Sequence, residues 1–259
     1  MKKLITLVCL TFTVSFSFAA KPYIPDYNDF TKLAYDNLDD DGKMEKISLK
    51  YIKPVSYAHE EANFILKIGN ISKKGTLYEG AFDGFTVIDI NKRDNYKEIA
   101  VHAPGDSDDD EYLIYAYDGK SIKEMGRLNR WPKFYGNGIV LVDNWVEFWA
   151  KRDKYVLNGK TRTLNLVPQE LYYVGIKAKA KKSFPLYQTI AGKKIVANLK
   201  PNSEIFILVC NPSTGKINQN GYADIFGYSY LIKSTTGLVG WVKGQILNGE
   251  KVEGLPIAD

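Results

Sequence analysis

The sequence is poor in cysteine and histidine, with two residues of each. This scarcity leaves few candidates for a disulfide, a nucleophilic cysteine or a histidine-based zinc site. Cys9 lies in an apolar N-terminal segment, so a chain without that segment keeps Cys210 alone and forms no intramolecular disulfide. Cys210 ends an apolar run, which predicts a buried thiol and not a nucleophile. His59 and His102 lie in no H-E-x-x-H motif, and no G-x-S-x-G elbow occurs. We therefore expect no enzyme, although any two carboxylates can form a glycosidase site.

Long hydrophobic runs are missing after the first twenty residues, since no later segment approaches the roughly 18 apolar residues of a membrane span. The chain opens "MKKLITLVCLTFTVSFSFAAKPY". Lys2 and Lys3 precede an apolar stretch, and Ser17 and Ala19 supply the small residues of a cleavage site. This pattern predicts a signal peptide over residues 1–19. We expect the rest of the chain to be exported, to the periplasm, the cell surface or the medium.

Neither sign of charge dominates the sequence. Residues 20–169 hold 22 basic and 24 acidic residues, whereas residues 170–259 hold 11 lysines and 6 acidic residues. A nucleic-acid partner requires a denser basic stripe than either part contains. The composition therefore predicts a mildly acidic first part, a basic second part and no nucleic-acid partner.

Helical periodicity is also weak, and the pattern of strands is strong. Many runs alternate or are short and apolar, with Gly, Asn and Asp between them: "EKISLKYI", "ANFILKI", "EIAVHA", "EYLIYAYDG", "GIVLV" and "VEFWA". The high content of tyrosine suits pleated, half-buried surfaces. The sequence therefore predicts an all-β protein.

A repeat of 52 residues lies within the first part. The segments "DNLDDDGKMEKISLKY" and "IDINKRDNYKEIAVHA" align Asn37 with Asp89 and Ile47 with Ile99. A third, degenerate copy covers residues 136–164. This length is in the range of propeller blades, but three copies are too few to close a ring. We therefore expect a partial propeller-like array.

The stretch "NLDDDGKME" in the first copy has the spacing of a calcium loop. Five alternate residues offer oxygen atoms: the side chains of Asn37, Asp39, Asp41 and Glu45 and the carbonyl of Lys43. Gly42 permits the sharp bend that such a loop needs. The loop lacks the glutamate at position 12 of an EF-hand and precedes a strand, which argues against the helical calcium hand. The alternative interpretation is an acidic, solvated turn.

At these residues "NLDDDGKMEKISL" resembles the D-x-D-x-D-G-x-x-D loop of FG-GAP/VCBS-type repeats, the blades of integrin-α-like propellers. The resemblance implies one structural calcium ion, bound just before a blade strand by the five residues named above. Asn replaces the first Asp of the family pattern and Glu replaces the last. The FG-GAP signature itself is absent.

Two further acidic segments are weaker metal candidates. In the second copy of the loop, Asp89 to Glu98, Arg93 and Lys97 stand where the first copy has Asp41 and Glu45. Positive side chains repel a cation, so we expect a structural loop closed by an Arg93 or Lys97 pair with Asp89. The cluster from Asp106 to Glu111 has no regular spacing and is typical of a solvated loop.

The composition changes near Tyr172, where we place the boundary between two domains, residues 20–171 and 172–259. "PLYQ", "VANLKPNSEIFIL" and "YLIKSTTGLVGWVKG" follow in this order and resemble the bacterial SH3-like domain over residues 176–246. The resemblance implies a small SH3-like β-barrel, with Trp241 packed in its closing strand. It also implies a targeting module directed at cell-wall peptidoglycan or peptides.

Four aromatic residues lie in or just after a long loop of this second domain: Tyr222, Phe226, Tyr228 and Tyr230. Aromatic rings beside a basic surface offer a large contact area to sugars or peptides at low entropy cost. The alternative is that these rings fill the barrel core and its edge.

These features together predict an exported, non-catalytic binding or adhesion protein of the cell envelope with one structural calcium ion. Its expected partner is cell-wall peptidoglycan, or a peptide or protein at the envelope. The alternative is a cell-wall hydrolase or a hydrolase inhibitor. A soluble periplasmic partner protein without glycan affinity is a third hypothesis.

Overall fold

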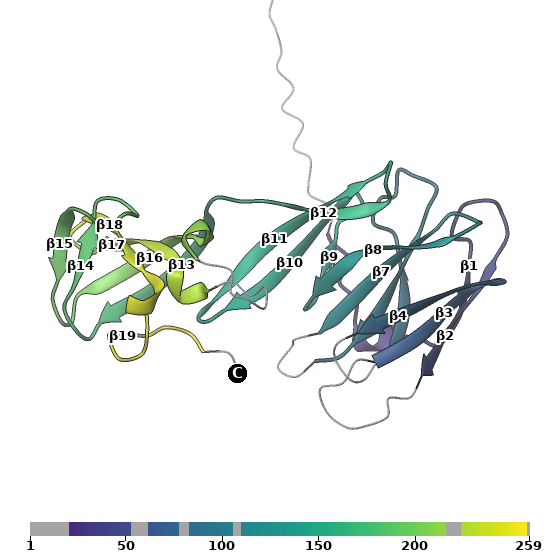
Figure 1. Ribbon diagram of the computed structural model, residues 1–259, viewed down its shortest axis with the longest axis horizontal. Coiled ribbons are helices and arrows are strands. Elements are labelled where there is room, and N and C mark those ends of the chain that lie inside the picture. The colour runs from purple at the N-terminus through teal and green to yellow at the C-terminus, as the bar shows by residue number, and fades with distance from the viewer. Residues whose placement is uncertain (1–20, 53–61, 78–82, 106–109, 216–223, 258–259) are drawn as a thin grey trace, which may run out of the picture.

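The computed structural model describes residues 21–52, 62–77, 83–105, 110–215 and 224–257 (Figure 1). Over these ranges the protein is all-β, which confirms the predicted class. Its helical elements are short 3-10 turns: η1 (Tyr27–Asp29), η3 (Pro212–Thr214), η4 (Ile225–Gly227) and η5 (Gly244–Ile246). No helix within the described ranges is long and apolar enough to cross a membrane.

Three four-stranded antiparallel sheets follow one another along the chain (Figure 1). The first sheet contains β1 (Leu33–Asp36), β2 (Glu45–Ile52), β3 (Ala62–Ile68) and β4 (Ile71–Leu77). The second sheet contains β5 (Gly84–Ile88), β6 (Glu98–Ala103), β7 (Glu111–Tyr117) and β8 (Ile122–Asn129). The third sheet contains β9 (Lys133–Phe134), β10 (Ile139–Val146), β11 (Trp149–Asn158) and β12 (Thr163–Val167). Neighbours in sequence are neighbours in each sheet, as in the predicted array of repeated β units.

One hydrophobic core joins the first sheet to the second, and another joins the second sheet to the third. Ile47 and Phe64 of the first sheet pack with Ile99 of the second sheet. Ala100, the next residue of β6, packs with Val140 of the third sheet. Successive side chains of a strand point to opposite faces, so β6 serves both cores. β6 and β7 are therefore buried along their whole length.

The N-terminal segment connects all three sheets, and we call residues 21–32 the N-terminal strap. Tyr23 and Phe134 of the third sheet exchange two backbone hydrogen bonds of 2.8 Å. Thr31 and Phe85 of the second sheet exchange two more, of 2.9 and 2.8 Å. The chain then enters β1 of the first sheet, so the strap fixes the three sheets to one another.

The remaining strands form one seven-stranded antiparallel sheet in the order β15-β14-β18-β17-β16-β13-β19. The strands are β13 (Tyr172–Ala180), β14 (Phe184–Tyr187), β15 (Ile195–Leu199), β16 (Glu204–Asn211), β17 (Ser229–Ser234), β18 (Val239–Lys243) and β19 (Val252–Glu253). Its core includes Leu186, Ile207 and Val242, together with Phe148 and Trp149 of the third sheet. The pairings among the described strands leave β15 and β19 at the two edges, and they show no closed barrel.

The structure corrects the alignment of the two loops in the repeat. Asp36 pairs with Glu45 across the first loop, whereas Ile88 pairs with Glu98 across the second loop. The second loop therefore holds one residue more than the first. As a result Glu98, and not Lys97, is the counterpart of Glu45.

Candidate metal site

The candidate metal loop is the connection between β1 and β2, residues 37–44. Leu38 anchors it, because its side chain is fully buried in the core between the first two sheets. The Leu38 backbone N–H donates to Glu45 Oε2 at 2.9 Å, and the Leu38 carbonyl accepts from the Lys97 N–H at 2.9 Å. Asp40 and Gly42 have positive φ angles of 56° and 83°, which bend the acidic residues around the anchor.

The acidic side chains of this loop converge. Asp39, Asp41 and Glu45 each offer a carboxylate oxygen, and these oxygens lie within 4.8 Å of one another. Oδ1 of Asn37 and Oδ1 of Asp39 are buried and accept no hydrogen bond. Buried oxygens without a donor are rare in proteins, because desolvation without a partner is costly. A hard cation bound by the three carboxylates would give Asp39 a partner, and the donor set of carboxylate oxygens fits calcium. The role of Asn37 as a further ligand stays a prediction.

Asp41 has a local partner that a metal ion would have to replace. The Lys43 ammonium lies 2.9 Å from Asp41 Oδ2, and the Lys43 N–H donates to Asp41 Oδ1 at 2.8 Å. The side-chain hydrogen bond from Lys43, followed by the backbone one, lowers the pKa of Asp41. The Lys43 side chain is 80% exposed, so it is free to move away into solvent. The expected role of the Lys43 carbonyl as a ligand stays a prediction.

The loop contacts a hairpin of the second sheet. A Cβ atom on Gly119, in the turn between β7 and β8, would lie 2.7 Å from Asp39 Oδ2. The Asp118 carboxylate in the same turn already accepts from the N–H groups of Lys120 and Ser121. Burial, followed by the charges of Glu45 and Asp39, raises the pKa of the neighbouring Tyr117. An ion in the loop would therefore sit at the junction of two sheets.

The second loop is closed by a residue that the sequence did not indicate. Arg162, at the end of the turn between β11 and β12, donates from Nη2 to Glu98 Oε1 at 2.6 Å. Its Nη1 lies 3.5 Å from Asp94 Oδ2, and its guanidinium carbon lies 4.3 Å from the centroid of the Tyr96 ring. Glu98 Oε2 accepts from the Ile90 N–H at 3.1 Å, as Glu45 does from Leu38. The guanidinium thus gives the second loop a positive charge.

The predicted pairing of Asp89 with Arg93 or Lys97 is wrong, because Asp89 forms an ion pair with neither of them in the described part of the chain, and Lys97 Nζ lies 2.7 Å from Asp36 Oδ1 instead. Asp89 Oδ1 is buried without a hydrogen-bond partner. Burial, followed by the charge of Asp94, raises the pKa of Asp89. Asp89 is therefore stabilised in its neutral form more than an exposed carboxyl would be.

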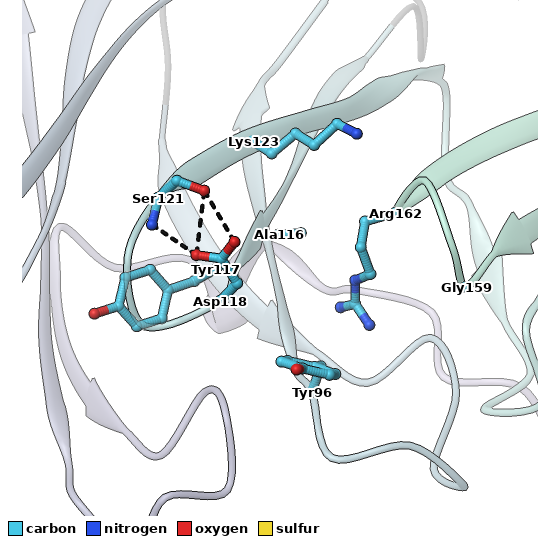
Figure 2. Close-up of a pocket in the computed structure, with 8 residues that line it drawn as sticks. All are labelled: Tyr96, Ala116, Tyr117, Asp118, Ser121, Lys123, Gly159 and Arg162. Carbon is cyan, nitrogen blue, oxygen red and sulfur yellow. Dashed lines mark hydrogen bonds between the residues drawn. The ribbon is translucent and has the colours of Figure 1, made fainter.

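A pocket of about 160 Å³ lies beside this second junction. Figure 2 shows Arg162 and Tyr96 on one side of it, Lys123 on another, and Asp118 bonded to Ser121. The Lys123 ammonium donates to the Thr161 carbonyl, and Arg162 binds Glu98. The two cationic side chains that line the pocket, Lys123 and Arg162, therefore already have partners within the protein.

The other acidic cluster lies partly outside the described residues, since Asp106 to Asp109 are not among them. Asp110 is fully buried, and its Oδ1 lies 2.9 Å from His102 Nε2. His102 Nδ1 lies 3.2 Å from Asp83 Oδ2. Burial is the largest influence on His102 and lowers its pKa, in opposition to the two carboxylates. Asp110 and Glu111 are both buried, so these two are not part of a solvated loop.

The aromatic candidates of the second part do not form an exposed group. Tyr228 and Tyr230 lie in the hydrophobic core, and Tyr230 Oη accepts a hydrogen bond from Trp149 Nε1 at 3.3 Å. This corrects the interpretation that their rings face a ligand. Phe226 is 56% exposed, and Tyr222 lies outside the described residues. Cys210 is buried, and burial raises its pKa to about 12, as expected of a core thiol.

Comparison of the chain with known proteins found no relative: no family model, no curated protein and no solved structure matches it.

Proposed function

We propose that the protein is an exported, non-catalytic binding protein of the cell envelope, with one calcium ion in the loop between β1 and β2. Two observations carry the calcium assignment: the carboxylates of Asp39, Asp41 and Glu45 converge, and Oδ1 of Asp39 and Oδ1 of Asn37 in the same loop are buried without a partner. A solvated acidic turn would leave these oxygens in water, where no ligand is needed. A calcium ion gives them partners.

A calcium ion in this loop stabilises the contact between the first and second sheets. The Asp39 carboxylate contacts the Gly119 turn of the second sheet, and the Leu38 carbonyl bonds to Lys97 just before β6. An ion that fixes the loop therefore also fixes the first sheet against the second. Because the ion binds the folded form, it stabilises that form by mass action.

The first experiment is a calcium titration of the mature chain after chelation, by calorimetry and thermal melting. We expect heat of binding and a rise of several degrees in Tm, both lost in Asp39→Ala. Asp40→Asn is the matched control. Asp40 is exposed and has a positive φ that asparagine tolerates, so this variant keeps the response. No response of the wild-type chain to millimolar calcium would make the loop an acidic turn.

The binding role is supported by the chemistry of the buried groups. Burial raises the pKa of the Cys210 thiol to about 12, and the His102 ring is fully buried, so neither group is accessible as a nucleophile or a base. Sedimentation with purified peptidoglycan tests binding, and a turbidity assay with the same material tests hydrolysis. Co-sedimentation without clearing supports the binding protein. Clearing supports the alternative, a cell-wall hydrolase.

A further inference from the structure

The outer face of the first sheet is rich in lysine. Ile47 and Leu49 of β2 point into the core shared with the second sheet, so Lys46 and Lys50 point the other way. The same alternation holds in β3, where Phe64, Leu66 and Ile68 are in that core and Lys67 lies on the opposite face. In Figure 1 this sheet lies at the end of the molecule away from the seven-stranded sheet.

The strand pairings bring these lysines together. Residues directly opposite each other in an antiparallel pair share a face. Three rows contain lysine: Tyr35 with Lys46, Leu33 with Ser48, Lys67 and Ser72, and Lys50 with Ile65 and Lys74. We call the surface formed by Lys46, Lys50, Lys67 and Lys74 the lysine face. From strand spacings of about 4.8 Å and a rise of about 3.4 Å per residue, the Cα atoms of these four lysines lie within a patch on the order of 15 Å across.

The lysine face has no compensating negative charge among its described residues. All four lysines are exposed, and none has an ion pair within the part of the chain that the structure describes. The outward positions of the described strands β1 to β4 carry no aspartate or glutamate. Residues 20–169 are slightly acidic overall, so the lysines are concentrated on this face and do not reflect a basic composition. Such a field attracts anions.

We propose that the lysine face binds a polyanionic glycan of the cell envelope, a polymer whose sugars carry phosphate or carboxylate groups. This proposal rests on the export and envelope role proposed above and names the chemistry of the ligand. A sheet face with four charges spread over three adjacent strands suits an extended polymer, and flexible lysine ammonium groups suit repeated anions without a fixed fork geometry. Tyr35, 57% exposed beside Lys46, offers a ring face for a sugar.

The test uses the mature chain and four probes: polygalacturonate, inorganic polyphosphate, a neutral dextran, and vesicles of phosphatidylglycerol. The variant K46E/K50E/K67E/K74E reverses the lysine face. The control K182E/K193E/K194E/K200E makes the same change in net charge with four exposed lysines of the second part. Lys73→Glu is a further control, because Lys73 lies on the same strand as Lys74 with the opposite orientation. Thermal melting checks that each variant folds. For a glutamate variant that does not fold, the same four lysines are changed to glutamine instead.

We expect the wild-type chain to bind a polyanionic polymer and not dextran, with affinity that falls as salt is added. The lysine-face variant loses about tenfold or more in affinity, while both controls stay within about threefold. Polygalacturonate and polyphosphate separate carboxylate from phosphate as the preferred group. Equal loss in the lysine-face variant and the fourfold control would overturn the proposal, as would binding to vesicles alone or to no probe.

Failure of the lysine face can be told apart from failure of the proposed function. The lysine-face variant keeps the calcium response, because its substitutions lie on the side of the sheet opposite the shared core. Peptidoglycan sedimentation that persists in this variant would keep the envelope role and place the ligand elsewhere on the molecule. A wild-type chain that neither responds to calcium nor sediments with peptidoglycan would instead contradict the proposed function itself.

Discussion

Arg162 and Glu98 form the most buried charge pair of the second loop, with side-chain exposures of 17% and 1%. A buried carboxylate without a partner is costly, and a guanidinium from another sheet supplies that partner. Arginine suits this role because its planar fork reaches Glu98 and Asp94 together and stacks on Tyr96. A point charge such as lysine cannot make all three contacts.

We predict that Arg162→Ala lowers the free energy of unfolding by about 3 kcal/mol, because Glu98 keeps its buried position and loses its partner. Glu98→Gln alone costs less, and the double variant Arg162→Ala/Glu98→Gln is more stable than the sum of the single changes requires. Urea unfolding at pH 8 measures all three. Strict additivity would show that the two residues do not interact. Arg162→Lys, which keeps the charge, tests the geometry of the fork.

Burial raises the pKa of Glu98 to about 7, although the Ile90 N–H and Arg162 oppose this. The folded chain therefore binds the Glu98 proton more tightly than the unfolded chain, whose glutamate titrates near 4.5. The resulting stability is fully present below pH 4.5 and is lost as pH rises through about 7. We expect a decrease of up to about 3 kcal/mol from this group over that window. Glu98→Gln should remove this part of the pH profile, and an unchanged profile would contradict the assignment.

At the scale of elements, the two junctions between sheets differ by single residues. The turn of β7 and β8 is closed by Asp118, which accepts from the N–H groups of Lys120 and Ser121. The turn of β11 and β12 is closed in the same way by Asn158. The second turn then adds Arg162, with a φ of 49°, before β12 begins. This added residue is the one that reaches the second loop.

The sequence predicted the strands better than it predicted the register across loops and turns, where single residues are added. The alternating runs predicted the β class and most strands, because period-two burial is a local property. The register across the loop is set by pairing, so the fixed 52-residue offset missed Glu98. "VEFWA" also predicted a strand, whereas the chain turns at Glu147, which has a φ of 54°. Tyr228 and Tyr230 alternate with buried Ile232, and this pattern predicts a core position.

The contact of the calcium loop with the β7–β8 turn gives a prediction for Gly119→Ala. Gly119 has a φ of 79°, and the added Cβ would lie 2.7 Å from Asp39 Oδ2. We expect a loss of about 1–2 kcal/mol in stability and a weaker calcium response, because Asp39 must shift. Gly237→Ala is the matched control, since its φ is 87° and no atom lies within 4 Å of the added carbon. Equal calcium affinity in both variants would contradict the proposed role of Asp39.

At the scale of the whole molecule, the third sheet and the seven-stranded sheet share one core. Trp149 of β11 is 3% exposed and packs there with Phe148 and Tyr230. We predict that Trp149→Ala costs about 3–5 kcal/mol and lowers amide protection in both β10–β11 and β16–β17. Trp145→Ala is the control, because Trp145 is half-buried on the same hairpin and lies outside this core. Loss of protection confined to β10–β11 would show that the two parts unfold separately.

The two junctions between the first three sheets differ in the source of their positive charge. Arg162 supplies a permanent cation to the second junction, whereas the first junction depends on the proposed calcium ion. Chelation should therefore loosen the first sheet and leave the pairing of the second and third sheets intact. Hydrogen exchange with and without a chelator measures this, with β6 and β7 as internal reference strands. Equal loosening of all three sheets would contradict a local calcium site.

The N-terminal strap has a consequence for the order in which the chain acquires its structure. Thr31 can bond to Phe85 once the second sheet has begun, but Tyr23 bonds to Phe134, so the strap cannot finish docking until more than half of the chain has been synthesised. Pairings between residues so distant in sequence form late, because loop closure costs entropy before any contact is gained. The early part of the chain thus remains an incomplete fold while it leaves the ribosome. For the export proposed above, this incomplete fold would be the form that passes through a narrow channel, and the strap would finish docking on the far side.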